Sequence, residues 1–269
     1  MLIMKQIDQK NKKILVINIS LRPNSNIAWV PVGLGYIMTS MYNAGINFDL
    51  LDIEAYRYSD QEIDQHLVTN VYDIYCLGTI VTGYSKIKWI TSKIREKNPN
   101  ATIICGNTVA SSIPEIILTK TEVDIAVMHE GDITILELIE AISHKTNLSD
   151  VKGIAYVDNN EIKFTQERPL IPDINELPLI NWDLFNLDIY FPKINNGVPL
   201  PYPMPKEQIK AFIINTARGC PFQCTFCYHA FKDKKYRYRS AESIVKEMKA
   251  MNQKYGINYF MFFDELTFF

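Results

Sequence analysis

The sequence contains no long apolar run. None of its stretches approaches the ~18 to 20 uninterrupted apolar residues that a membrane-spanning helix needs. The richest stretch, YFMFF at 259–263, has the length of a strand. Near the amino terminus Lys5, Gln6 and Asp8 interrupt the apolar segment, which therefore lacks the pattern of a secretory signal. We expect a cytoplasmic protein that has no membrane partner.

The sequence also lacks an excess of either charge. It has 28 Lys and Arg residues against 30 Asp and Glu residues, a net charge of −2 over 269 residues. Proteins that bind nucleic acid attract phosphate with a broad basic surface, so a nucleic-acid partner is not expected. Hydrophobic residues make up 47% of the chain, which is enough for a folded protein with a substantial core. The ligands must therefore be inferred from individual sites.

Cysteine is scarce and unevenly placed. Three of the five cysteines, Cys220, Cys224 and Cys227, lie within the short stretch RGCPFQCTFCYHA. The other two, Cys76 and Cys105, lie in apolar segments and are predicted to be core residues. In a reducing cytoplasm, clustered cysteines are typical of metal ligands or redox groups rather than of structural disulfides.

Apolar strand-like runs alternate with segments of helical period through the first half of the chain. Apolar runs without strict alternation are typical of strands buried on both faces, as in a parallel sheet with crossover helices. The pattern predicts an α/β fold, a doubly wound parallel sheet domain of flavodoxin-like (Rossmann-like) strand order, over residues 1–145. The predicted strands are 14–19, 48–53, 73–81, 101–106 and 123–128, and the predicted helices include 31–45, 84–98, 111–120 and 132–144.

The pattern changes after this domain. The segment VKGIAYVDNNEIKFTQERP predicts a hairpin that turns at residues 158–160, and eight of the thirteen prolines fall between Pro169 and Pro205. We predict that residues 146–208 form a hairpin and an ordered but irregular proline-rich linker. Residues 209–269 then predict a strand, the cysteine loop, a helix that ends near Gly256 and a second strand.

Three thiolates spaced four and three residues apart can converge on one side of a small inorganic cluster. A structural zinc site takes four ligands, and only His229 is close enough in sequence to complete such a set. A four-iron four-sulfur cluster can be held by three cysteines, because the remaining iron is then free to bind a substrate or cosubstrate. Disulfide pairing would leave one cysteine over. The spacing therefore favours the iron–sulfur cluster over zinc.

The stretch ARGCPFQCTFCYHA resembles the signature of the radical S-adenosylmethionine (SAM) enzymes, and so do the flanking strand and helix segments. The resemblance implies the start of a TIM-type partial barrel, in which Cys220, Cys224 and Cys227 hold a 4Fe-4S cluster. The open iron of that cluster would bind SAM, which is cleaved reductively to methionine and a 5′-deoxyadenosyl radical. The residues that the resemblance places beside SAM are Phe226, Tyr228, Asp264 and Glu265.

Three places at the predicted carboxyl ends of the first domain's strands resemble cobalamin-binding domains. They are TIV at 79–81, GNT at 106–108 and HEGD at 129–132. The implied cobalamin contacts are Thr79, Val81, Gly106, Asn107, His129 and Gly131. The sequence departs from the pattern at two points. It has no Asp-x-His-x-x-Gly motif that would place a His on cobalt, and Asn107 stands where a second glycine is expected.

Together the two resemblances imply a cobalamin (B12)-binding-domain radical SAM enzyme with a 4Fe-4S cluster, SAM and cobalamin as cofactors. The expected reaction is cobalamin-dependent methyl transfer or related radical chemistry on an unidentified small molecule, with an electron donor such as flavodoxin or ferredoxin. A radical SAM barrel needs several strand–helix units, and residues 209–269 supply only the first unit and the next strand. We therefore expect a fragment that ends early in the barrel and is inactive alone.

Two alternatives remain open from the sequence. One is a radical SAM enzyme resembling the transfer RNA methylthiotransferases, which carry a second cluster on three amino-terminal cysteines. This chain has only Cys76 and Cys105 in that region. The other alternative is a cobalamin-binding or metal-binding module that has no catalytic activity.

Overall fold

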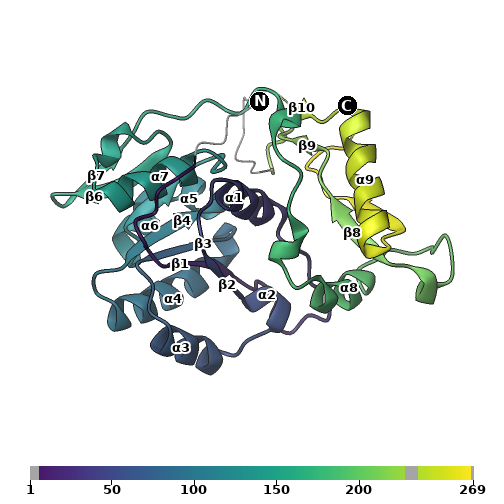
Figure 1. Cartoon of the computed structure of the whole chain (residues 1–269), viewed down its shortest axis with the longest axis horizontal. Coiled ribbons are helices and arrows are strands. Elements are labelled where there is room, and N and C mark those ends of the chain that lie inside the picture. Colours follow the sequence, from purple (N-terminus) through teal and green to yellow (C-terminus); the bar gives the residue numbers. More distant parts are fainter. Residues whose placement is uncertain (1–5, 228–235, 268–269) are drawn as a thin grey trace. The chain divides into compact units, whose positions relative to one another are not determined.

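The computed structural model of the protein describes residues 6–227 and 236–267 (Figure 1). The described chain divides into two compact units. Residues 6–23 and 37–170 form the first, which we call the sheet unit. Residues 24–36 belong to the second, the cysteine unit, together with the chain from 171 onward.

The sheet unit is built on a sheet whose strands, among the described residues, follow the order β2-β1-β3-β4-β5-β6-β7. The first five run parallel in the flavodoxin order 2-1-3-4-5, which confirms the predicted fold class. All residues of β1 are buried, so both of its faces are covered. The strands are β1 (Ile14–Asn18), β2 (Asp49–Asp52), β3 (Ile74–Gly78), β4 (Thr102–Gly106), β5 (Ile125–Val127), β6 (Ile154–Asp158) and β7 (Glu161–Phe164).

Helices connect the parallel strands. The four predicted helices are present, one of them with an interruption, whereas the helices at 53–56 and 60–69 were not predicted. The helix expected over 111–120 is divided at Ile113, because the residue before a proline disfavours the helical backbone and Pro114 starts a new helix. None of the described helices has the length and apolar character needed to cross a membrane. The helices are α1 (Val32–Asn43), α2 (Ile53–Tyr56), α3 (Asp60–Thr69), α4 (Tyr84–Lys97), α5 (Asn107–Ser112), α6 (Pro114–Lys120) and α7 (Thr134–His144).

The predicted hairpin is present and extends the sheet. Strands β6 and β7 pair antiparallel, and their turn places Asn159 and Asn160 at positive φ, as in a tight two-residue hairpin. The change of pattern in the sequence predicted this hairpin as part of the linker region, residues 146–208. In the structure β6 also pairs antiparallel with β5, so the sheet continues beyond the parallel strands.

The cysteine unit contains the expected strand, helix and second strand. Strands β8 (Ala211–Ile214) and β11 (Tyr259–Phe262) pair in parallel, and α9 (Ala241–Tyr255) lies between them in sequence. Helix α9 ends at Gly256, whose φ of +72° is favourable for glycine. The short strands β9 (Ala217–Arg218) and β10 (Arg237–Tyr238) pair antiparallel and join the two ends of the cysteine loop.

The proline-rich segment contains a helix that the sequence analysis did not predict. Helix α8 (Leu187–Asn195) includes Pro192 and was therefore hidden by the breaker signal. Asn195 ties α8 to β8, since its side chain donates to the Ile209 carbonyl and accepts from the Ala211 amide. The ring of Phe191 packs edge-on against Phe212 of β8.

The paired glycines at the ends of β3 and β4 generate a stability prediction. Gly78 and Gly106 are register partners, and a Cβ at Gly78 would lie 2.7 Å from the Gly106 carbonyl oxygen. A Cβ at Gly106 would meet nothing within 4 Å. We therefore expect Gly78→Ala to lower the free energy of unfolding by about 1–3 kcal/mol because backbone must shift. Gly106→Ala should change it by less than about 0.5 kcal/mol.

Urea unfolding of the two variants, followed by far-ultraviolet circular dichroism, measures this difference. Equal destabilisation by both substitutions would contradict the assignment of the steric conflict to Gly78 alone.

Candidate functional site

The cysteine loop leaves β9 through Gly219, whose φ is +83°. Cys220 is half-buried, whereas Cys224 and Cys227 are exposed, and all three are free thiols. The Cys227 amide donates to the Cys224 carbonyl over 3.1 Å, so these two cysteines flank one turn of chain. Within residues 6–227 and 236–267, no three His, Cys, Asp or Glu side chains are already gathered as metal ligands. The chemistry of the loop, three free thiols on one short segment, fits an iron–sulfur cluster.

The aromatic residues of the loop differ in what the structure describes. Phe226 has 91% of its side chain exposed, so its ring is available to a ligand. Tyr228 lies outside the described residues.

Asp264 and Glu265 follow β11 directly, as expected, but their surroundings differ. Glu265 is exposed. The Asp264 carboxylate accepts hydrogen bonds from the Thr216 amide at 2.7 Å, the Thr216 hydroxyl at 2.6 Å and the Ala217 amide at 3.1 Å. The Asn215 side chain donates to it as well, at 3.2 Å. Asp264 therefore contacts the turn that leads into β9, and its predicted contact with SAM stays a prediction.

Arg239, the last residue of the basic run that follows the cysteine loop in sequence, also holds this turn. Its guanidinium donates to the Asn215 carbonyl at 3.1 Å and forms an ion pair with Glu247 of α9. Its backbone amide donates to the Thr216 carbonyl at 2.8 Å. Both charged side chains of the pair are almost completely buried. A buried pair eight residues apart is not visible in the sequence, because Arg239 belongs to a longer basic run and Glu247 to a helix with several charged residues.

In the sheet unit, the predicted cobalamin residues follow the carboxyl ends of β3, β4 and β5. Thr79 is buried, and its carbonyl accepts from the Val109 amide at 3.1 Å. Val81 is 44% exposed. Gly106 ends β4 and faces space that no protein atom fills within 4 Å of its Cβ position. Such an open position, at the edge where ligands of doubly wound sheets bind, fits a bound group.

Asn107, His129 and Gly131 complete the predicted set with different local roles. Asn107 and His129 both have positive φ, at +67° and +60°. The His129 amide donates to the Ser111 hydroxyl at 2.8 Å, and its ring nitrogen lies 3.8 Å from a Glu167 carboxylate oxygen. A Cβ at Gly131 would lie 2.9 Å from an Ile37 methyl carbon, so this glycine is explained by packing within the unit.

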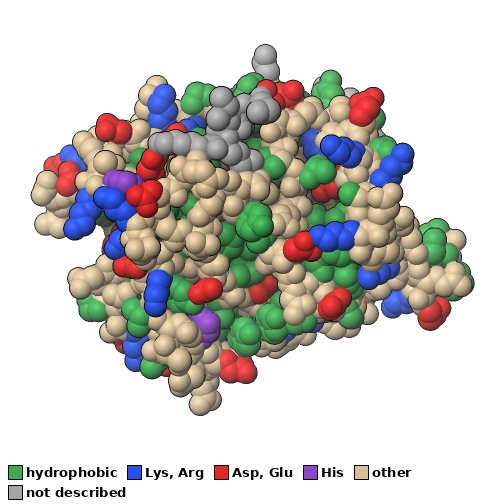
Figure 2. Space-filling model, viewed as in Figure 1, with side chains coloured by type: hydrophobic (Ala, Val, Ile, Leu, Met, Phe, Trp, Pro, Cys, Tyr) green, Lys and Arg blue, Asp and Glu red, His purple; other side chains and the backbone are tan. Residues whose placement is uncertain are grey.

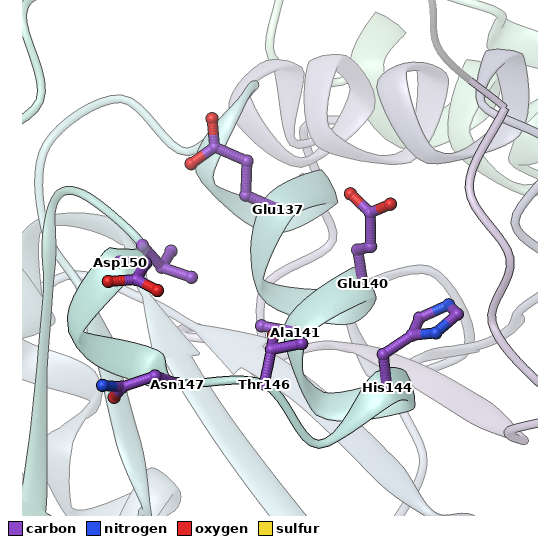
Figure 3. Close-up of a pocket in the computed structure, with 8 residues that line it drawn as sticks. Glu137, Glu140, Ala141, His144, Thr146, Asn147 and Asp150 are labelled. Atoms are coloured by element: carbon purple, nitrogen blue, oxygen red, sulfur yellow. The ribbon is translucent and has the colours of Figure 1, made fainter.

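A surface depression at the end of α7 contains none of these residues (Figure 3). Glu140 and His144 project from α7 into it, and Asp150 lies on the following turn. His144 is engaged with Asp8, through contacts of 3.1 Å to its carbonyl and 3.6 Å to its carboxylate. On the face seen in Figure 2, acidic and basic side chains are interspersed, in agreement with the low net charge.

Comparison with known proteins identifies the families of the two matched segments. Residues 24–139 match the B12 binding domain family, and residues 214–265 match the radical SAM superfamily. The chain belongs to the B12-binding-domain radical SAM family. The first match includes the ends of β2, β3, β4 and β5, and the second includes the cysteine loop. Strand β8, α9 and β11 are thus the beginning of the family's partial barrel.

Relatives within this family differ in their named activities. The chain is 27% identical over 239 residues to an uncharacterized methyltransferase of Pyrococcus horikoshii, covering 87% of this chain and 48% of the relative. It is 31% identical over 235 residues to a putative methylthiotransferase of Methanocaldococcus jannaschii, covering 78% of this chain and 45% of the relative. The chain thus spans about half the length of these curated relatives.

A solved structure shares the fold across almost the whole chain. It is the cobalamin-dependent S-adenosylmethionine radical enzyme OxsB with aqua-cobalamin and S-adenosylmethionine bound. The TM-score is 0.74 at 20% identity, and the match covers 96% of this chain and 34% of OxsB. At 20% identity this structural likeness is evidence for the fold of the chain alone.

The two sets of cysteines should differ in reactivity. Burial raises the pKa of both the Cys76 and Cys105 thiols to about 12, so neither is a nucleophile near neutral pH. The three loop cysteines are accessible in part or in full. We expect a maleimide to add three labels to the folded, metal-free protein at pH 7.5 and five in denaturant.

Intact mass spectrometry followed by peptide mapping counts and locates the labels. Modification of Cys76 or Cys105 in the folded protein would show that these strands open, and would contradict the prediction.

Proposed function

We propose that the whole protein is a radical SAM enzyme that cleaves SAM reductively and transfers a methyl group in a cobalamin-dependent reaction. The observation that carries the proposal is the loop of three free cysteines, Cys220, Cys224 and Cys227. This loop starts directly after β9, which pairs with β10. The family membership and the preceding sheet unit support it.

In this proposal the three loop cysteines hold a 4Fe-4S cluster and leave one iron open for SAM. The bound cluster would supply the electron that cleaves the sulfonium of SAM to methionine and the 5′-deoxyadenosyl radical. The exposed ring of Phe226 would lie against SAM, and the exposed carboxylate of Glu265 could accept from its amino group. Tyr228 and Asp264 belong to the same proposed SAM set.

Cobalamin is proposed to bind at the carboxyl edge of the sheet unit. The open position at Gly106, the last residue of β4, would admit it. Asn107 follows Gly106, and Thr79 and Val81 follow the neighbouring strand β3. His129 and Gly131, after β5, complete the proposed set. Because the His129 ring already faces Glu167, we assign it a lining role and no contact with cobalt.

The remaining proposals concern partners and location. We propose an unidentified small-molecule substrate and an electron donor such as flavodoxin or ferredoxin. Free thiols and an exposed cluster loop fit a reducing compartment, so we place the protein in the cytoplasm. Methylthiotransferase activity is favoured by one named relative, but a second cluster would need the buried Cys76 and Cys105 and a third cysteine that the sequence lacks in that region.

The cluster proposal is tested by anaerobic reconstitution with iron and sulfide. We expect the chain to bind about four irons and to show the absorption of a 4Fe-4S cluster. Replacement of Cys220, Cys224 and Cys227 together by Ala should abolish both signals, because all cysteine ligands are then removed. Replacement of Cys76 and Cys105 by Ala is the matched control and should leave the cluster intact. Absence of a cluster from the wild type would refute the proposal.

The cobalamin proposal is tested by a size series at Gly106. Gly106→Leu should weaken hydroxocobalamin binding by at least about tenfold, since the side chain would occupy space that the protein leaves open. Gly106→Ala should have a smaller effect. Equilibrium dialysis measures the affinity, and a melting curve for each variant confirms that the sheet unit remains folded. Equal affinity of all three proteins would place cobalamin elsewhere or nowhere on this chain.

A further inference from the structure

The turn at residues 215–217 is the root of the cysteine loop. It joins β8 to β9, and Gly219 and Cys220 follow β9 directly. Almost every polar group of this turn is engaged by residues far away in the sequence. Asp264 accepts from both backbone amides at 216 and 217 and from the Thr216 hydroxyl. The Asn215 side chain donates to the Asp264 carboxylate and to the Phe263 carbonyl.

The carbonyl groups of the turn accept hydrogen bonds from a different residue, Arg239. The Arg239 amide donates to the Thr216 carbonyl, and the Arg239 guanidinium donates to the Asn215 carbonyl. Glu247 fixes that guanidinium through the buried ion pair. The turn therefore has both its donors and its acceptors satisfied, and Thr216 is only 5% exposed. These hydrogen bonds restrain the backbone of the turn through its donors and through its acceptors.

Tyr236, which follows the cysteine loop in sequence, bonds to the chain just after Asp264. The phenol of Tyr236 has its pKa raised by burial and, beyond that, by the charges of Asp264 and of Cys220. Both groups therefore lie in the electrostatic surroundings of one side chain. The Tyr236 hydroxyl is held in place because it donates to the Leu266 carbonyl at 2.9 Å.

We propose that Asp264 is a positioning residue that fixes the root of the cysteine loop so that its three thiolates can close on one cluster. The inference rests on the proposed function. Cys224 and Cys227 are exposed, so the described packing around them does not fix their direction. The direction is set instead at the turn, where a carboxylate makes charge-assisted hydrogen bonds to two backbone amides and a hydroxyl. Residues that orient the metal-binding side chains raise the affinity for the metal, although they do not contact the metal themselves.

The test compares cluster retention in reconstituted wild type, Asp264→Ala and Asp264→Asn, challenged anaerobically with an iron chelator. Asp264→Ala removes all four bonds and should release iron about 10- to 100-fold faster. Asp264→Asn keeps an oxygen for the two amides and can donate to the Thr216 hydroxyl, so it should restore most of the retention. Rescue by Asn, and a return of the wild-type paramagnetic resonance spectrum of the reduced cluster, would not follow from a general loss of packing.

Asp183→Ala is the matched control, because Asp183 also lies in the cysteine unit but its carboxylate bonds only to Lys254 and Tyr255 among the contacts described. Its iron retention should equal that of the wild type. If Asp264→Ala does not fold, Thr216→Val tests the inference in its place. This substitution removes only the hydrogen bond from the Thr216 hydroxyl to Asp264, and it should accelerate iron loss about two- to threefold. Retention equal to the wild type in Asp264→Ala, or in Thr216→Val where Asp264→Ala is unfolded, would overturn the inference. A wild type without any cluster would overturn the proposed function as well.

Discussion

Parallel pairing of buried strands is the constraint on which both proposed sites depend. In the sheet unit β3, β4 and β5 run in one direction, so the polar residues after each strand emerge at one edge. In the cysteine unit β8 and β11 are parallel, so the turn after β8 and Asp264 after β11 also meet at one edge. In both units, residues distant in sequence are brought together because hydrogen-bonded backbones fix the ends of the strands.

Much of this arrangement could be predicted from the sequence, because uninterrupted apolar runs mark strands that are buried on both faces. The five parallel strands and the strand order of the sheet unit follow from that signal. The pairing of β6 with β5 does not, since a hairpin that extends a sheet has the same local pattern as one that stands alone. Helix α8 was missed because Pro192 lies inside it, and β9 and β10 are too short to show any periodicity.

The candidate site shows the same division between local and distant information. The cysteine spacing is local, so the cluster loop was recognisable. Asp264 and Glu265 are adjacent carboxylates, and the sequence predicts the same role for both. In the structure Asp264 is bonded to the turn at 215–217, whereas Glu265 is exposed. The partners of Asp264 lie 47 to 49 residues earlier in the chain. No pattern in a single sequence links positions at that distance. The hydrogen bonds between Asp264 and the turn at 215–217 are therefore visible only in the structure.

Gly78 and Gly106 show how a fold can separate a structural requirement from a ligand requirement. The two glycines are direct partners at the ends of neighbouring strands, and a sequence pattern gives them equal weight. Gly78 is needed by the protein itself, because a side chain there would collide with the Gly106 carbonyl. No neighbouring protein atom requires a glycine at Gly106, and its φ of −123° is accessible to any residue. Neither packing nor backbone conformation explains this glycine. Its place at the edge where doubly wound sheets bind ligands supports the proposal that a bound group needs the space.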